Sequence, residues 1–253
     1  MPWELPRDQS SRLRLAKGYP FIAPETSYLF VDGRSEDFSK VTEYGIKLSD
    51  RKAVIAHGSN RAPEQLSRKF VGHPSGQDPI PLTAIWLHDH DVVYSAHVAR
   101  YGAVAAELVY CPGTSVQVFL TWLTDDQLVR MHETELPGGN YSYGHVQCQW
   151  ESSENHDLPT DPNRLAVYRS SFGAFNFHGK PLALSAIPAI NRRYDALGQE
   201  EVLRLVHKGH GTDQDLDDAI LKFIEASQYR SKVVEAVRKQ SLDVFHPSYS
   251  ISR

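Results

Sequence analysis

The distribution of apolar and polar positions divides the chain into a weakly patterned beginning, a strand-rich middle and a helical end. Residues 1–50 are polar, are interrupted by prolines and contain one strand-like run at 27–31. Apolar runs typical of strands follow at residues 53–56, 84–87, 92–94, 103–110 and 116–123. The last four runs are separated only by turn residues, which favours a strongly curved sheet or a barrel.

Helical periodicity appears in the middle and at the end of the chain. Pro63 suits the first turn of a helix over 63–70, and a second helix starts at the capping box Thr124-Asp125-Asp126-Gln127 and ends before Pro137. Further helices are predicted from residue 200 to 208, after a cap at Thr212, and around 233–237. Strands and helices together predict an α+β fold.

Composition narrows the class of protein. The 253 residues are 41% hydrophobic and carry a formal net charge of −4, which supports a folded core and argues against nucleic acid as the main partner. Two cysteines exclude a disulfide scaffold or a four-cysteine zinc site. No run approaches the ~18 apolar residues of a membrane span, and the beginning lacks the apolar centre of a secretory signal. From these absences we expect a cytoplasmic protein with no membrane partner.

The helix over 125–135 contains the strongest candidate for chemistry. At about 100° per residue, Glu135 lies on the same face as Leu128 and Met131, whereas Glu133 points away from that face. A carboxylate on a buried face is costly unless it is paired, and desolvation raises its pKa towards values useful for proton transfer. The alternative is that Glu135 only accepts hydrogen bonds from the loop that follows the helix.

The loop 57–60, between a predicted strand and a predicted helix, is the second candidate. Gly58 allows close approach of the backbone, and free N–H groups at the start of a helix favour a carboxylate or phosphate. Neither a P-loop nor a GxGxxG motif occurs. An ordinary capped turn remains the alternative interpretation.

The order and spacing of these segments resemble the gamma-glutamylcyclotransferase-like (AIG2-like) superfamily over roughly residues 53–190. The family's YGSN loop corresponds to residues 57–60, and its Gly-Ala-rich strand and PG turn correspond to 101–104 and 112–116. Its LDxxEG helix, followed by a tyrosine, corresponds to residues 131–136 and Tyr141. The family's catalytic glutamate therefore falls on Glu135, the residue that helical periodicity selects independently.

The resemblance implies a small mixed β-barrel with flanking helices and a cyclotransferase activity that needs no cofactor and no metal. The α-amine of a gamma-glutamyl amine, amide or peptide would attack its own γ-carbonyl and release 5-oxoproline. Glu135 would be the general acid/base, because a tethered nucleophile needs only orientation and proton transfer. The residues implied for substrate binding are His57, Gly58, Ser59, Asn60, His132 and Tyr141.

Three positions depart from the family's motifs. His57 replaces the tyrosine of YGSN, His132 replaces the aspartate of LDxxEG, and Leu136 replaces its glycine. The differences at His57 and Leu136 would reshape the pocket on the amine side of the substrate, whereas His132 could alter the pKa of Glu135 or contact the substrate. We also expect activity to depend on pH through His57 and His132.

The resemblance leaves both ends of the chain unassigned. We expect an N-terminal extension over residues 1–50, the barrel over 51–190 and a C-terminal helical extension over 191–253. A lid, a dimer surface and additional core all stay open as roles for the extensions, so a homodimer is one assembly to consider.

Three alternatives remain open. A metal site at His88-x-His90, with His97 nearby, lacks a recognisable ligand spacing. A Ser-His-Asp hydrolase lacks the GxSxG motif, because Gly58-Ser59-Asn60 has no second glycine. A non-catalytic member of the same fold could instead bind a small molecule or a partner protein.

Overall fold

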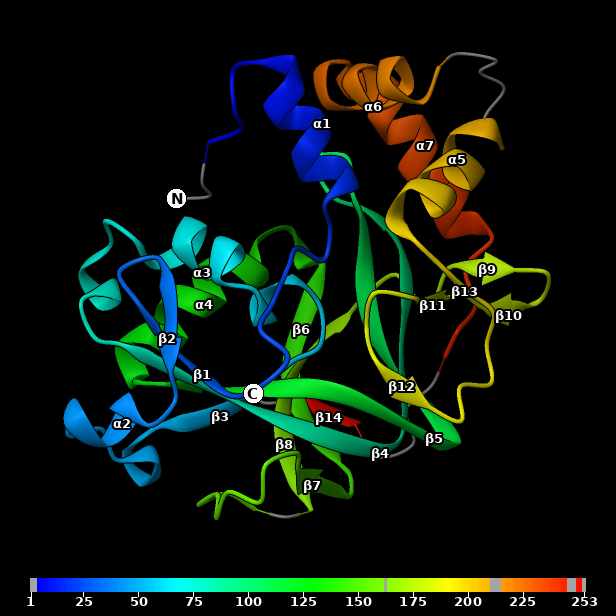
Figure 1. The fold of residues 1–253 in the computed structure, drawn as a ribbon. Coiled ribbons are helices and arrows are strands. Elements are labelled where there is room, and N and C mark those ends of the chain that lie inside the picture. The colour runs from blue at the N-terminus through cyan, green and yellow to red at the C-terminus, as the bar shows by residue number, and fades with distance from the viewer. Residues whose placement is uncertain (1–3, 162, 210–214, 245–248, 252–253) are drawn as a thin grey trace.

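The computed structural model describes residues 4–161, 163–209, 215–244 and 249–251, which form a large mixed sheet with helices around it (Figure 1). The α-helices of these residues are α1 (Gln9–Lys17), α2 (Lys40–Glu43), α3 (Pro63–Phe70), α4 (Asp125–Glu135), α5 (Gln199–Lys208), α6 (Leu216–Glu225) and α7 (Ser227–Lys239). Short 3₁₀ turns are η1 (Leu48–Asp50), η2 (Ser59–Arg61), η3 (Pro74–Gly76) and η4 (Pro137–Gly139). The α+β class predicted from the sequence is confirmed.

The described residues place 12 strands in the large sheet and two in a separate ribbon. The large sheet contains β1 (Tyr28–Val31), β2 (Arg34–Asp37), β3 (Lys52–Ala56), β4 (Ile80–Val98), β5 (Val104–Leu123), β6 (Tyr141–Gln147), β7 (Trp150–Ser152), β8 (Arg164–Ser170), β11 (Ala183–Leu184), β12 (Ala189–Ile190), β13 (Ala196–Leu197) and β14 (Tyr249–Ile251). The ribbon pairs β9 (Asn176–Phe177) with β10 (Lys180–Pro181). The main path runs β13-β11-β4-β5-β3-β8-β6-β14 and does not close among the described residues, so a barrel is not confirmed.

The hairpin of β4 and β5 differs from the sequence-based expectation. Four separate strands were predicted over 84–123, and this is wrong, because the two long strands pair on both sides of an irregularity. The register shifts between His88 and His90, and Asp89 and Gly113 both have positive φ, 57° and 83°. The Asp89 carboxylate accepts a hydrogen bond of 2.7 Å from the Gly113 N–H. The residues read as turns therefore form a bulge that bends the hairpin without ending either strand.

The bend brings the far half of the hairpin towards the end of β8. There the buried Glu107 carboxylate accepts a hydrogen bond of 2.6 Å from the Ser170 N–H, and the Ser95 and Ser170 hydroxyls lie 2.7 Å apart. Burial raises the pKa of Glu107 to about 8, against the lowering effect of the Ser170 N–H. These bonds thus connect β8 to β4 and β5, with which it shares no ladder in the described part of the chain.

The N-terminal segment contains more regular structure than predicted. The run at 27–31 is confirmed as β1, but the expectation of an otherwise irregular segment is wrong, since α1, β2 and α2 also form. Asp8 caps α1 by accepting the Ser11 N–H at 2.8 Å. Pro6 and Pro20 lie outside α1, so they limit its length but do not prevent it.

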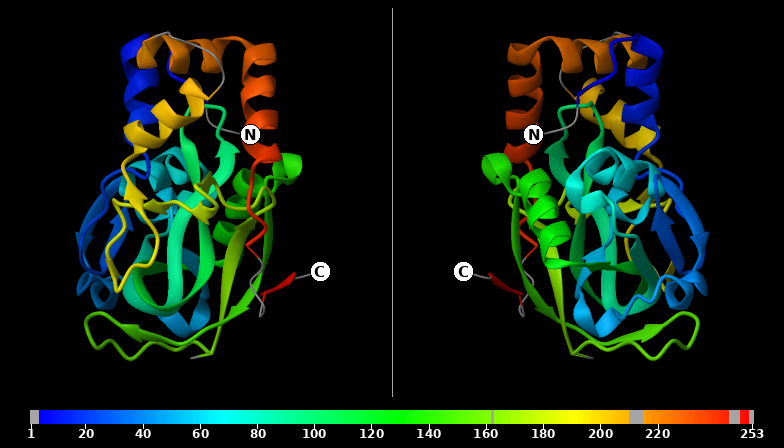
Figure 2. Two further views of the ribbon diagram at one scale, coloured as in Figure 1. Left: turned by 90° about the vertical axis from the view of Figure 1, so that its right-hand side faces the viewer. Right: turned by 90° about the vertical axis from the view of Figure 1, so that its left-hand side faces the viewer.

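Helix α1 joins the C-terminal helices α5, α6 and α7 at one end of the molecule (Figures 1 and 2). Leu15 and Ala16 of α1 are buried in the same core cluster as Ile220 and Phe223 of α6. The predicted cap Thr212 lies outside the described residues, and Asp215 caps α6 by accepting the Asp217 N–H. Both ends of the chain therefore add to the core that supports the sheet.

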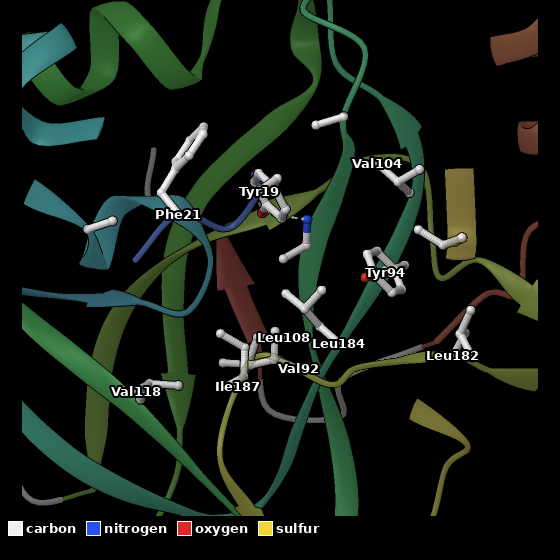
Figure 3. Close-up of a cluster of buried hydrophobic side chains, with 14 of the residues drawn as sticks. Tyr19, Phe21, Val92, Tyr94, Val104, Leu108, Val118, Leu182, Leu184 and Ile187 are labelled. Atoms are coloured by element: carbon white, nitrogen blue, oxygen red, sulfur yellow. Dashed lines mark hydrogen bonds between the residues drawn. The ribbon is translucent and has the colours of Figure 1, made fainter. Parts of the chain in front are cut away.

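That core extends to the hairpin of β4 and β5 through the residues that follow α1. Tyr19 and Phe21 belong to the same buried cluster as Val104 and Leu108, and the Tyr19 hydroxyl bonds to the backbone of β5 (Figure 3). Within the described part of the chain, no helix has both the length and the apolarity needed to cross a membrane.

Candidate active site

The predicted strand, loop and helix around residues 53–70 form as β3, η2 and α3, and the loop between them approaches two other segments closely. A Cβ added to Gly58 would lie 2.6 Å from the Tyr19 hydroxyl oxygen and 3.2 Å from the Ala106 Cβ. Only glycine leaves room for that hydroxyl, so the requirement at this position is close approach of another side chain. The Tyr19 oxygen accepts the Ala106 N–H at 2.8 Å.

Glu135, the last residue of α4, is anchored through one carboxylate oxygen. Its side chain is 14% exposed, and Oε1 accepts hydrogen bonds from the Lys69 ammonium and, at 3.0 Å, from the Asn60 Nδ2. No described residue donates a hydrogen bond to Oε2. The second oxygen is therefore available to a ligand.

The Lys69–Glu135 pair determines the charge at this point. Burial favours a protonated Glu135, but Lys69 and then Asn60 outweigh burial and hold the pKa of Glu135 below its usual value of 4.5. The raised pKa expected from burial is therefore wrong, because the Lys69 ammonium pairs with the carboxylate. Lys69 is 2% exposed, and burial lowers the pKa of its ammonium while Glu135 opposes that effect. The two side chains are placed as an ion pair, a carboxylate beside an ammonium.

His57 lies beside the carboxylate but is uncharged. It is 7% exposed, and burial lowers its pKa to about 4, more than the nearby Glu135 raises it. No hydrogen bond joins the His57 ring to the Ser59 hydroxyl in the described part of the chain, so the two form no hydrogen-bonded dyad. This geometry disfavours the serine hydrolase alternative.

Three tyrosines complete the walls. The hydroxyls of Tyr19 and Tyr141 meet the backbone of one residue: Tyr19 accepts from the Ala106 N–H, and Tyr141 donates to its carbonyl at 3.4 Å. The Tyr168 hydroxyl bonds to Nδ1 of His132 at 2.7 Å. Burial raises the pKa of all three phenols, so they remain protonated donors.

Two adjoining pockets meet at Glu135. The inner pocket, with about 350 Å³ of empty space, is lined by residues 55–60 and by Tyr19, Ala106, Glu135, Tyr141 and Tyr168. The outer pocket, with about 1170 Å³ of empty space, includes Lys69, Arg100 and Tyr101. Both share Tyr19, Ser59, Glu135 and Tyr141 as wall residues, so a ligand can extend from one into the other.

The structure brings six of the seven sequence-predicted residues to the inner pocket. They are His57, Gly58, Ser59, Asn60, Glu135 and Tyr141. His132 lines neither pocket and touches the site only through Tyr168. Leu136 is the C-cap residue that follows α4, and its N–H donates to the His132 carbonyl.

Sequence reasoning missed Tyr19, Tyr168 and Lys69. Lys69 left a detectable signal: at about 100° per residue it lies about 60° from Leu66, on the apolar face of its helix. A lysine on such a face needs a buried partner. Tyr19 left no signal, because it belongs to the segment outside the resemblance.

The proposed histidine metal site finds no support in the ring contacts. His88 Nδ1 lies 2.9 Å from the Ser115 hydroxyl, and His90 Nδ1 lies 2.6 Å from the His88 carbonyl oxygen. Across the described ranges, no three His, Cys, Asp or Glu side chains are grouped closely enough to hold a metal ion.

Comparisons with known proteins find similarity at the level of structure. No family model matches the chain, and no curated protein sequence does. A gamma-glutamyl cyclotransferase structure is similar at 14% identity and a TM-score of 0.37, covering 74% of this chain and 98% of that one. An uncharacterized protein from Homo sapiens follows at 12% identity and 0.36, covering 73% and 98%. YkqA from Bacillus subtilis is 10% identical at 0.36, covering 87% and 76%.

At these identities and TM-scores, activity and substrate have to be inferred from the site.

Proposed function

We propose that this protein is a cyclotransferase that converts a gamma-glutamyl amine, amide or peptide into 5-oxoproline and a free amine. One observation carries the proposal: Glu135 is fixed through Oε1, while Oε2 has no donor among the described residues and its side chain lines a small pocket. A fixed, ionised carboxylate with one unoccupied oxygen is suited to accept a proton from a bound ammonium group.

The inner pocket is suited to the gamma-glutamyl group. The backbone N–H groups of Gly58, Ser59 and Asn60 donate to no acceptor among the described residues. They are available to the substrate's α-carboxylate or to the oxygen on which charge develops. The outer pocket would then hold the departing amine.

The reaction balances with Glu135 as its acid/base. Oε2 accepts a proton from the α-ammonium, and the resulting amine attacks the γ-carbonyl, forming the ring C–N bond. Breaking the bond between the γ-carbon and the original amide nitrogen completes the exchange. The attacking nitrogen loses two protons in total and the departing nitrogen gains two, each carried in turn by Glu135.

The test is turnover of a panel of gamma-glutamyl amines, amides and dipeptides, with 5-oxoproline measured by mass spectrometry. We expect turnover by the wild type and a roughly 10²–10⁴-fold lower kcat/KM in Glu135→Gln. Asp126→Asn, an acid-to-amide change at an exposed position of the same helix, is the matched control and should retain the wild-type rate.

Two results would contradict the proposal. Full activity in Glu135→Gln would refute the role of this carboxylate. Binding of gamma-glutamyl compounds without turnover would favour the alternative, a non-catalytic member of the fold that binds a small molecule or a partner protein.

A further inference from the structure

Lys69 is a buried cation whose position no sequence motif of the site explains. It lies on α3, and its ammonium contacts Oε1 of Glu135 and the Met131 sulfur, the latter at 3.2 Å. Its side chain is 2% exposed, so the lysine has been removed from water almost completely. Burying an ammonium is unfavourable unless its partner compensates, which makes the Glu135 contact the main reason for this arrangement.

We infer that Lys69 is a positioning residue for Glu135: it fixes the carboxylate through Oε1 and thereby presents Oε2 to the substrate. The inference rests on the proposed function, in which Oε2 exchanges the proton.

The geometry supports this role because two donors approach the same oxygen from different elements. Lys69 comes from α3, and Asn60 comes from the loop after β3. Their combined hold on Oε1 opposes rotation that would exchange the two oxygens. Lys69 also lines the outer pocket, next to the proposed position of the departing amine.

Other groups near the pair do not substitute for the Lys69 charge. The groups that act electrostatically on Glu135 or Lys69 are His57, Tyr19, Tyr101, Tyr141, Tyr168 and Arg130. His97, Arg100 and Glu133 also line the outer pocket. Burial keeps His57 and these tyrosines uncharged at neutral pH. Arg130 binds the Lys69 carbonyl at 2.8 Å and Glu133 at 3.0 Å. Loss of the Lys69 charge therefore removes the main influence that opposes burial, which is the largest single influence on the pKa of Glu135.

Replacing Lys69 by a neutral residue consequently has a defined electrostatic effect. Without the ammonium, the largest influence that lowers the pKa of Glu135 is lost while burial still favours the protonated carboxyl, so the pKa of Glu135 rises. Activity that needs ionised Glu135 is lost as pH falls through this pKa. The acid limb of the kcat/KM profile should thus move to higher pH. At pH values below the limb, each pH unit of this displacement lowers kcat/KM tenfold.

The experiment compares the wild type with Lys69→Met, Lys69→Arg and Lys40→Met. Lys40 forms a partly exposed pair with Glu36 and is the matched control. Kinetics are measured across the acid limb, and the Glu135 side-chain carboxyl is titrated by ¹³C NMR, assigned by its loss in Glu135→Gln. We expect Lys69→Met to shift both the acid limb and the NMR titration midpoint to higher pH. Lys69→Arg should return both part of the way to their wild-type pH, and Lys40→Met should leave both unchanged.

An unchanged acid limb and NMR midpoint in folded Lys69→Met would overturn the inference, even if thermal stability fell. If that variant does not fold, Lys69→Gln provides the same neutral test and keeps a hydrogen-bond donor. If the wild type makes no 5-oxoproline, the proposed function fails. In that case the NMR midpoint alone decides whether Lys69 sets the ionisation of Glu135.

Discussion

The contact between Gly58 and Tyr19 joins the N-terminal segment to the loop of the proposed site, and a double-mutant cycle can test it. In Gly58→Ala, the new methyl group would lie 2.6 Å from the Tyr19 oxygen, which must move away. Overpacking of this kind costs about 1–3 kcal/mol. Tyr19→Phe removes the oxygen and leaves the buried Ala106 N–H without its partner, at a cost of about 1–3 kcal/mol.

The two costs should not add. Once the Tyr19 hydroxyl is absent, the shortest remaining contact of the new methyl group is 3.2 Å to the Ala106 Cβ, and the hydrogen bond is already lost. In the Tyr19→Phe background, Gly58→Ala should therefore destabilise the protein by about 1–2 kcal/mol less than it does in the wild type. This difference is the coupling free energy of the two substitutions.

The assay is urea unfolding of the wild type, both single variants and the double variant. Tyr249→Phe combined with Gly58→Ala is the control, because the Tyr249 hydroxyl bonds instead to the Ser142 carbonyl. The control pair should add. Additivity of Gly58→Ala and Tyr19→Phe within about 0.5 kcal/mol would refute the proposed contact.

Three further changes have defined outcomes. Folded wild type prefers protonated Glu107, so its free energy of unfolding should fall by up to ~5 kcal/mol as pH rises from 4.5 to about 8. Glu107→Gln keeps the acceptor for Ser170, and its urea unfolding should show a flatter pH dependence. Neutral His57 stabilises the fold above pH 6.5, and the free energy of unfolding should fall by about 3 kcal/mol as pH falls from 6.5 to about 4. His57→Gln should reduce this loss in acid unfolding curves. Asp91→Ala leaves Arg192 without the carboxylate that it binds at 3.0 Å, and calorimetry should show a loss of about 3–5 kcal/mol while kcat of the folded protein is unchanged.

The part of the site that depends on local sequence was predictable. Helical periodicity identified Glu135, because the face of a short helix follows from residue spacing alone. The capping box at Thr124 and Gln127 formed as predicted, with both of its reciprocal bonds present. The residues of the loop 57–60 also reach the pocket together, since they are adjacent in the chain.

The part that depends on tertiary contacts was not predictable in the same way. Tyr19 lines the pocket and belongs to the core cluster that α1 shares with the C-terminal helices, and no local pattern encodes that packing. Asp89 and Gly113 carry the usual signals of a turn, yet the same positive φ values also suit a bulge between paired strands.

The pKa values of His57 and His132 also depend on tertiary structure and could not be predicted from local sequence. Their unperturbed pKa lies near neutrality, which led to the expectation of pH-dependent activity. Burial lowers the pKa of both, and that of His57 to about 4, so dependence through His57 is expected in acid. His132 acts on the pocket only through Tyr168, and Tyr168→Phe should separate that influence from any direct one.

The most direct test of the central claim is the identity of the product formed in H₂¹⁸O. Attack by the substrate's own α-amine consumes no water, so mass spectrometry of the gamma-glutamyl product should show 5-oxoproline without ¹⁸O. Glutamate carrying one ¹⁸O atom would contradict intramolecular attack and show that water cleaves the bond.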